Sequence, residues 1–315
     1  MGKLKKLVVV MVLCVALMPA MKVKAYTPYE GDKVTGLEQT DATETSITIR
    51  WSATNGAASY RVKSSFMKED IYEEVTGTTY TFSCPKNTSC NIEVFPINAD
   101  GGQGYNSQAQ IYVQSLPLKV ANVRVANLAE DPNKFFLQWD YNELEDQKYG
   151  YVPDGYEVTA YNHNNKKVQK LNSTTNATKL SKLKKNAVYK IVIKPFIKVK
   201  SDKAKKYGKA FNFYYVPQPA LSVDNGAITQ TCIPLKWKKI TGATKYEIWI
   251  SNSPDKGYKK VATVKGSTTA YKFKKFKGKK INTFKKNYYI QMVTVAKIGK
   301  KTVKSEKKLL GYVTH

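Results

Sequence analysis

The stretch IPLKWKKITGATKYEIWI, residues 233–250, decides the fold. Apolar residues alternate with other residues up to Trp237, a short Gly-containing connection follows, and a second alternating run begins at Tyr246. Successive side chains of a β-strand point to opposite faces, so a period of two is typical of a strand with one buried face. The stretch therefore predicts two consecutive strands, with Trp237 and Tyr246 on their buried faces.

The same Trp-to-Tyr arrangement occurs twice earlier in the chain, and the three tryptophans lie 88 and 98 residues apart. A later landmark, a Cys in the first copy and a Tyr in the other two, recurs at spacings of 99 and 99 residues. Self-similarity of this kind indicates repeated structural units. The predicted core markers of the repeat are Trp51, Tyr60, Trp139, Tyr156, Tyr189, Trp237, Tyr246 and Tyr288.

Short alternating runs with turn signals every ten or so residues indicate β-sandwiches rather than βαβ units. No stretch shows a sustained 3.6-residue period, and Pro-bearing segments at 115–118 and 216–220 are typical of short linkers. The predicted fold class is all-β, with three tandem sandwiches at 34–116, 117–216 and 217–315.

Three features of the third copy stand out: the Trp of its second strand, the TGATKY approach to its third strand (241–246) and the Tyr that opens its sixth. In these features the third copy resembles a fibronectin type III domain, an immunoglobulin-like fold. The second copy has LKKNAVY (183–189) in place of the family's L-x-P-x-T-x-Y corner. The first departs most, with CPKNTSC (84–90) at that corner. The resemblance covers about residues 34–315, and the copies are similar to those found in tandem on proteins secreted by Gram-positive bacteria. It implies a fold and a role in display, spacing or adhesion, and it implies no ligand.

Residues 1–25 are predicted to form a signal peptide. Three lysines precede an apolar run at 7–17, and Val23-Lys24-Ala25 supplies the small residues of a cleavage site. The apolar run is shorter than the ~20 residues that span a bilayer. The alternative is a retained anchor. No second apolar run follows, so the mature chain is expected to lack a transmembrane segment and to be secreted, either extracellular or associated with the cell surface.

Charge is unevenly distributed along the chain. Residues 26–116 carry 6 Lys/Arg against 11 Asp/Glu, a net charge of −5. Residues 117–216 carry 19 against 9, and residues 217–315 carry 22 against 4, giving +10 and +18. The three predicted domains are therefore acidic, basic and strongly basic in that order.

The lysine-rich run YKFKKFKGKKINTFKKNYY (271–289) is a candidate surface for anionic polymers. Such clusters bind polyanions with an affinity that falls with salt. The alternative is that the lysines form only the solvated face of a strand, because Tyr271 and Phe273 alternate as a strand requires. The candidate residues are Lys272, Lys274, Lys275, Lys277, Lys279, Lys280, Lys285 and Lys286.

Trp249 is a candidate surface contact. Tyr246, Ile248 and Ile250 take the inward positions, which leaves Trp249 on the outer face of its strand. An exposed Trp brings a large contact area at low entropic cost. The alternative is that a neighbouring strand, a lysine side chain or the adjacent domain covers it.

Cys84 and Cys90 replace two residues that normally pack at the corner of the fold. In an exported protein, a Cys pair that closes a short loop predicts a disulfide, and two buried thiols are the alternative. Cys232 has no partner within its copy and is expected to point outward. It is therefore either an intermolecular bridge or a shielded thiol.

Pro96 and Pro195 lie six residues after Cys90 and Tyr189, in strands that are normally central. Proline lacks the N–H that a central strand donates. We therefore expect a bulge or an early strand end in the first two copies. Thr294 holds this position in the third copy, which is expected to be regular.

The chain is expected not to be an enzyme and to need no cofactor or metal. Its two histidines, His163 and His315, belong to no catalytic or metal-binding motif. The predicted function is a secreted binding or spacer protein that adheres through anionic polymers. Its expected partners are anionic cell-wall or extracellular polysaccharides or surface proteins, with nucleic acid disfavoured. The alternatives are a specific protein or carbohydrate receptor that uses the outer face of the third copy, or a glycosidase-like enzyme with two facing carboxylates.

Overall fold

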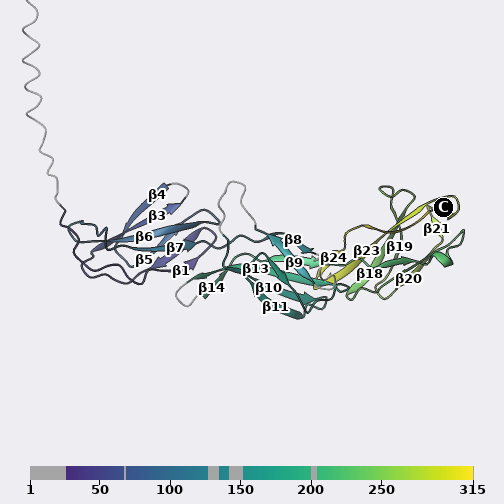
Figure 1. Ribbon diagram of the computed structural model, residues 1–315, viewed down its shortest axis with the longest axis horizontal. Coiled ribbons are helices and arrows are strands. Elements are labelled where there is room, and N and C mark those ends of the chain that lie inside the picture. The colour runs from purple at the N-terminus through teal and green to yellow at the C-terminus, as the bar shows by residue number, and fades with distance from the viewer. Residues whose placement is uncertain (1–25, 67–68, 127–134, 142–151, 200–203, 315) are drawn as a thin grey trace, which may run out of the picture. The chain divides into compact units, whose positions relative to one another are not determined.

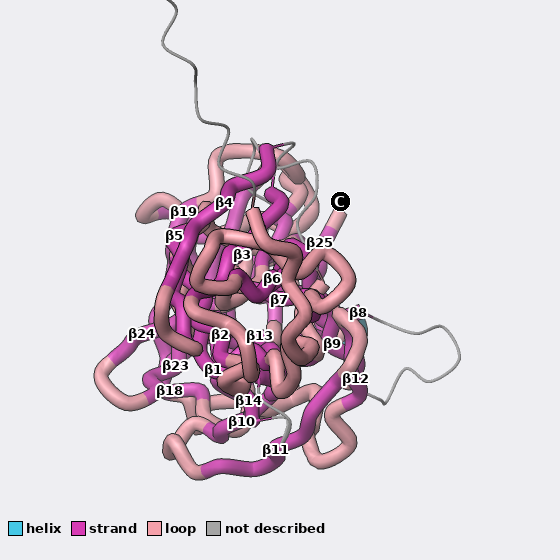
Figure 2. Tube along the Cα trace, turned by 90° about the vertical axis from the view of Figure 1, so that its left-hand side faces the viewer, coloured by secondary structure: helices cyan, strands magenta, loops and turns pink. Residues whose placement is uncertain are grey.

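The computed structural model describes residues 26–66, 69–126, 135–141, 152–199 and 204–314 (Figure 1). Within these ranges, strands joined by loops and turns make up the chain, and the helical element is the 3-10 turn Asn225–Ala227 (Figure 2). The predicted all-β fold is confirmed. No helix in the described ranges has the length and apolar character needed to cross a membrane. The predicted signal peptide, 1–25, lies outside them.

The residue contacts divide the chain into two compact units. The first comprises Met1–Leu37, Arg50–Tyr80 and Asn91–Ile111, and the second comprises Glu38–Ile49, Thr81–Cys90 and Tyr112–His315. The second and third sequence copies therefore lie within one unit. The division into three domains at 34–116, 117–216 and 217–315 stays a prediction.

Most of a four-stranded antiparallel sheet lies in the first unit, in the order β4-β3-β6-β7. Its bounds are β3 (Ser59–Phe66), β4 (Glu69–Val75), β6 (Ser89–Ile97) and β7 (Ala109–Gln114). Along β3, Tyr60 and Val62 are buried while Arg61 and Lys63 are half-buried, as the alternation predicts. A three-stranded sheet, most of which belongs to the second unit, has the order β1-β2-β5. Its bounds are β1 (Glu38–Ala42), β2 (Ser46–Arg50) and β5 (Thr79–Ser83).

The second and third copies repeat one architecture, a three-stranded sheet with a five-stranded sheet. In the second copy the orders are β12-β9-β8 and β11-β10-β13-β14, with β15 also pairing β13. Its strands are β8 (Ala121–Ala126), β9 (Phe136–Asp140), β10 (Gly155–Asn162), β11 (Lys167–Ser173), β12 (Ala177–Lys179), β13 (Tyr189–Val199), β14 (Ala204–Tyr207) and β15 (Phe211–Tyr215).

In the third copy the orders are β16-β17-β20 and β19-β18-β23-β24, with β25 also pairing β23, and a short hairpin β21-β22 is added. Its strands are β16 (Leu221–Val223), β17 (Ile233–Trp237), β18 (Ala243–Ser251), β19 (Lys259–Lys265), β20 (Ala270–Phe273), β21 (Lys275–Phe276), β22 (Lys279–Lys280), β23 (Tyr288–Ile298), β24 (Lys301–Lys304) and β25 (Leu309–Val313).

Each copy contains an edge-on contact between its marker tryptophan and the tyrosine that follows. The Trp and Tyr ring centroids lie 5.3, 5.0 and 5.6 Å apart in the three copies, with interplanar angles of 69°, 68° and 71°. Edge-to-face contact is a favoured arrangement of aromatic rings because the positive ring edge meets the negative ring face. All eight predicted core markers are buried.

The hydroxyls of these tyrosines differ in their hydrogen bonds. The backbone N–H of Thr54 donates to Tyr60 Oη at 2.8 Å, and that of Ile240 donates to Tyr246 Oη at 2.8 Å. In the second copy Tyr156 Oη lies near Trp139 and Tyr141 without a well-formed hydrogen bond within the described residues. The connection between Trp139 and Tyr156 is the longest of the three and includes residues 142–151, outside the described ranges.

The expectation for the prolines was wrong. Pro96 lies inside β6 opposite Tyr60, and Pro195 lies inside β13 opposite Tyr156, so neither strand ends early and neither register shifts there. On its other edge, β13 pairs with β15 up to Ile193 and with β14 from Phe196 onward. Pro195 therefore falls between two partner strands, at a place where no ladder N–H is required. In the third copy, which was expected to be regular, the pairing of β18 with β23 does shift in register, between Ala243 and Lys245.

We predict that Tyr246→Phe destabilises the third copy by about 1–3 kcal/mol, because it leaves the buried Ile240 N–H without an acceptor. Tyr156→Phe removes a hydroxyl that has no well-formed hydrogen bond, so its effect on the free energy of unfolding should be close to zero. Urea unfolding of both variants followed by fluorescence measures the difference. Equal destabilisation by the two substitutions would contradict this assignment.

Candidate binding surfaces

The aromatic residues of the lysine-rich run belong mainly to the core. Phe273 and Phe276 are buried and contact the Tyr288 ring edge-on, at centroid distances of 5.6 and 6.4 Å. Tyr271 is half-buried and packs against the same cluster, whereas Phe284 is 69% exposed. The sequence alternation thus separates buried rings from exposed lysines, and only Phe284 is available as an exposed aromatic among them.

Four of the eight predicted lysines line one cavity of about 560 Å³: Lys272, Lys274, Lys275 and Lys280. Lys272 lies on β20 opposite Pro234 of β17, and Lys275 pairs with Lys280 across the β21-β22 hairpin. The other lining residues are Ala227, Thr229, Thr231, Cys232 and Pro234. The lining thus contains four cations, two hydroxyl groups and no carboxylate. Within the described residues, none of the four lysines forms an ion pair.

Cys232 contributes to the wall of this lysine cavity. It is half-buried, and its backbone N–H and C=O both bond to Thr229, at 3.2 and 3.0 Å. The sequence placed Cys232 outside the core but could not place it beside Lys272 and Lys280, which come at least 40 residues later. Its role as a bridge or as a shielded thiol stays a prediction.

Lysine side chains cover Trp249. Its ring is half-buried, with Lys307 Nζ 3.5 Å and Lys260 Nζ 5.9 Å from the ring centroid. Trp249 Nε1 is buried near the Glu247 carboxylate, without a well-formed hydrogen bond within the described residues. A cation over an aromatic face is attracted by the ring quadrupole. In the structure, lysine side chains thus cover Trp249. The role of Trp249 as a surface contact stays a prediction.

Glu247 lies two residues before Trp249 on the same outward face of β18, between Lys260 and Lys304. It is 5% exposed, and its carboxylate contacts Lys304 Nζ at 3.1 Å and Lys260 Nζ at 3.9 Å. Burial opposes its ionisation, but the hydrogen bond and charge of Lys304, with the charge of Lys260, outweigh burial and hold the pKa of Glu247 below its ordinary value. Glu247 therefore organises lysines on this face and remains a carboxylate at neutral pH.

Cys84 and Cys90 are both buried thiols in the structure. Burial raises the pKa of Cys84 to about 11. Burial, with the charge of a Cys84 thiolate, raises the pKa of Cys90 to about 12. Both cysteines are free in the structure, and the disulfide stays a prediction.

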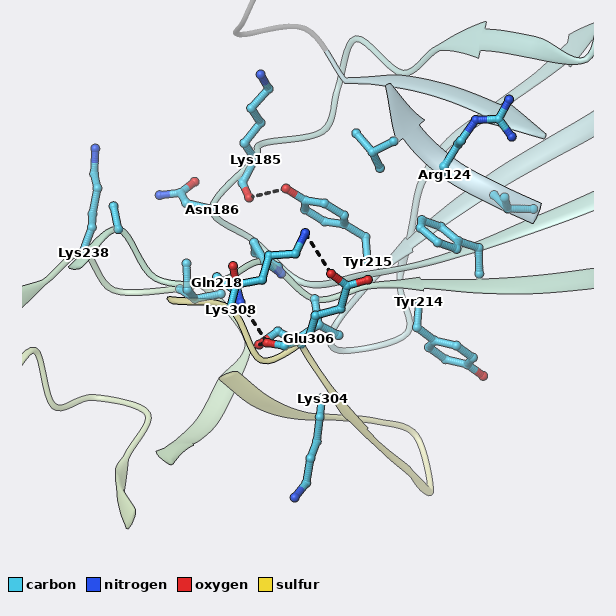
Figure 3. Close-up of a pocket in the computed structure, with 18 residues that line it drawn as sticks. Arg124, Lys185, Asn186, Tyr214, Tyr215, Gln218, Lys238, Lys304, Glu306 and Lys308 are labelled. Atoms are coloured by element: carbon cyan, nitrogen blue, oxygen red, sulfur yellow. Dashed lines mark hydrogen bonds and ion pairs between the residues drawn. The ribbon is translucent and has the colours of Figure 1, made fainter. Parts of the chain in front are cut away.

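A cavity of about 820 Å³ lies where the second and third copies meet (Figure 3). At its centre Lys308 Nζ contacts the Glu306 carboxylate at 2.9 Å, and Gln218 Nε2 donates to the Glu306 C=O at 2.8 Å. Tyr215 Oη donates to the Lys185 C=O at 3.0 Å. In Figure 3 the amine ends of Lys185, Lys238 and Lys304 point away from this centre. The polar groups at its centre, those of Lys308, Glu306 and Gln218, are thus paired with one another, which is typical of a structural joint.

Hydrogen bonds and a shared core join the two copies beside this cavity. The Val188 N–H donates to the Thr241 C=O at 3.0 Å, and the Thr241 N–H donates to the Asn186 C=O at 2.9 Å. Val188 is fully buried in the core of the third copy. Gly242 has φ of +90°, and a Cβ there would lie 2.7 Å from His163 Cβ. Glycine is therefore required at this close approach between copies.

Within the described residues, no group of three or more His, Cys, Asp or Glu side chains is placed to hold a metal ion. The described arrangement offers basic and aromatic surfaces as its candidate sites.

No family model matches the chain. No curated protein matches it either. Among solved structures, the chain is similar to a two-domain fibronectin type III segment of chicken tenascin, with 16% identity and a TM-score of 0.31 over 59% of this chain and 100% of that one. It is also similar to the FN1–FN3 domains of chicken CNTN1, with 14% identity and a TM-score of 0.27 over 88% of this chain and 99% of that one. Both are tandem fibronectin type III structures.

The predicted disulfide is tested by alkylating denatured, unreduced protein and measuring its mass. In protein that lacks residues 1–25, we expect Cys232 alone to be modified, because Cys84 and Cys90 are bonded to each other. Modification of all three cysteines would show that the pair is reduced.

In the reduced protein, the two corner thiols should make stability fall at alkaline pH. The folded state holds their protons with pKa values of about 11 and about 12, against an ordinary value of 9.0. Their contribution is therefore complete below pH 9 and is lost as the pH rises from 9 towards 12. We expect the stability difference between wild type and Cys84→Ala/Cys90→Ala, measured with urea under reductant, to shrink between pH 8 and pH 11. A constant difference would contradict the raised pKa values.

Proposed function

We propose that this chain is a secreted, non-catalytic binding protein that attaches to anionic polymers through its third copy. The observation that carries the proposal is the lysine cavity, in which Lys272, Lys274, Lys275 and Lys280 surround a space of about 560 Å³ without a carboxylate in its lining. Closely placed like charges in the free protein favour a ligand that carries several negative charges.

The charge of the whole third copy supports the same partner class. Residues 217–315 carry a net charge of +18, and all 22 of their basic residues are lysines. Lysine acts as a compact point charge, whereas arginine recognises particular groups through a planar fork. Attraction to a repetitive polyanion needs charge density more than a fixed geometry. Anionic cell-wall or extracellular polysaccharides are therefore the proposed partners, and surface proteins with acidic stretches are included.

Charge reversal tests the proposal. The variant Lys272→Glu/Lys274→Glu/Lys275→Glu/Lys280→Glu should elute from a heparin resin at clearly lower salt than wild type, because each lost contact with the polymer also removes the release of about one counterion. The matched control reverses four exposed lysines elsewhere in the third copy, Lys259, Lys265, Lys297 and Lys300. Both variants have the same net charge, so the control should retain more binding. Equal elution of the two variants would show that only net charge matters and would remove the cavity from the proposal.

A further inference from the structure

A row of tyrosines crosses the outer face of the sheet β19-β18-β23-β25 in the third copy. Tyr289 of β23 and Tyr312 of β25 are direct partners in the strand register. Their ring centroids lie 6.4 Å apart and their planes meet at 33°, so the rings lie side by side with similar tilt. Tyr312 is 62% exposed and Tyr289 is half-buried. The pair therefore presents a broad aromatic surface to solvent.

The row continues towards β19. Ser251 of β18, which has a small side chain, lies opposite Tyr289 in the strand register. Tyr258, just before β19, donates from its hydroxyl to the Pro254 C=O at 2.8 Å. Burial raises the pKa of Tyr258, and Gln291, the Asp255 carboxylate and Tyr289 also act on it, so the Tyr258 hydroxyl lies beside the row with Asp255 nearby.

The second copy shows that the fold does not demand this exposed pair. Its register equivalent is Lys190 opposite Tyr214. Lys190 Nζ lies 5.7 Å from the Tyr161 ring centroid, and Lys301 Nζ from the third copy lies 4.3 Å from the Tyr214 centroid. A cation of the next copy thus covers the tyrosine there. In the third copy no described residue places a cation over Tyr312.

Lysines lie beside the tyrosine row, two residues further along β23 from Tyr289. Trp249 lies opposite Gln291, and Lys307 and Lys260 lie over its ring. The carboxylate beside Trp249 on β18, Glu247, is already paired with Lys304 and Lys260. Lys307 has no ion-pair partner within the described residues, so its charge is available to a ligand. The surface therefore combines flat aromatic rings with an adjacent, unneutralised cation.

We propose that Tyr289, Tyr312 and Lys307 form a binding surface for an acidic polysaccharide. The C–H faces of its sugar rings pack on Tyr289 and Tyr312, and a carboxylate of the sugar pairs with Lys307. Tyrosine suits this contact because it offers a rigid ring area at low entropic cost. The inference rests on the proposed function for the anionic character of the partner, and it adds that the polymer is built of sugar acids rather than of phosphate groups alone.

The experiment compares two polyanions of matched charge and length, polygalacturonate and inorganic polyphosphate. Polyphosphate has no sugar faces, so both polymers test charge and only polygalacturonate tests stacking. Wild type should bind polygalacturonate more tightly, and the preference should grow as salt screens the charges. Tyr289→Ala/Tyr312→Ala should weaken polygalacturonate binding about tenfold, as expected for two stacked tyrosines, and leave polyphosphate binding unchanged. Lys307→Ala should reduce the preference as well.

The matched control is Tyr112→Ala, which removes a tyrosine that is 57% exposed on β7. It should bind both polymers as wild type does, and unfolding curves check that every variant is folded. The inference is overturned if wild type shows no preference for polygalacturonate, or if the preference survives in Tyr289→Ala/Tyr312→Ala. Binding of neither polymer at low salt would instead overturn the proposed function itself, so the two failures are distinguishable.

Discussion

The edge-on contact between each marker tryptophan and its tyrosine is the constraint on which the rest of the structure depends. Trp237 ends β17 and Tyr246 lies in β18, so their contact joins the two sheets of the third copy at a fixed register. A shift of one residue in either strand would turn its buried side chains to solvent. The contact therefore also determines which residues of the neighbouring positions face outward, including Lys236 and Trp249.

Local alternation made the strands and their buried residues predictable from the sequence. Trp237 and Tyr246 could be assigned because each strand repeats its own pattern within a few residues. The position of Pro195 inside β13 could not be predicted, because it depends on the gap between β14 and β15, two strands that follow it in sequence. The lysine that covers Trp249 could not be predicted either, since Lys307 comes 58 residues later. Periodicity gives the face of a residue and leaves its neighbours across the sheet undetermined.

The contact between the second and third copies could not be predicted from the sequence for the same reason. Val188 belongs by sequence to the corner of the second copy, yet it is buried in the core of the third. The TGATKY segment resembled a family feature, but its Thr241 and Gly242 also serve the joint, through hydrogen bonds to residues 186 and 188 and through the close approach of His163. A third copy cut at residue 217 would lose Val188 from its core, and the resulting cavity would cost stability.

The strong positive charge of the third copy is compatible with its fold because the alternation leaves nearly all the lysines outside. Exposed lysines contribute little to stability whether or not they are paired, so their placement is free to serve binding. The two sheets use this freedom differently. The β16-β17-β20 side gathers lysines around a cavity that lacks a carboxylate, whereas the β18-β23-β25 side neutralises Glu247 and exposes tyrosines. Under the proposals above, charge on one side would hold a polymer loosely at many positions, and rings on the other would select its chemistry. Affinity and selectivity would then belong to different faces of one sandwich.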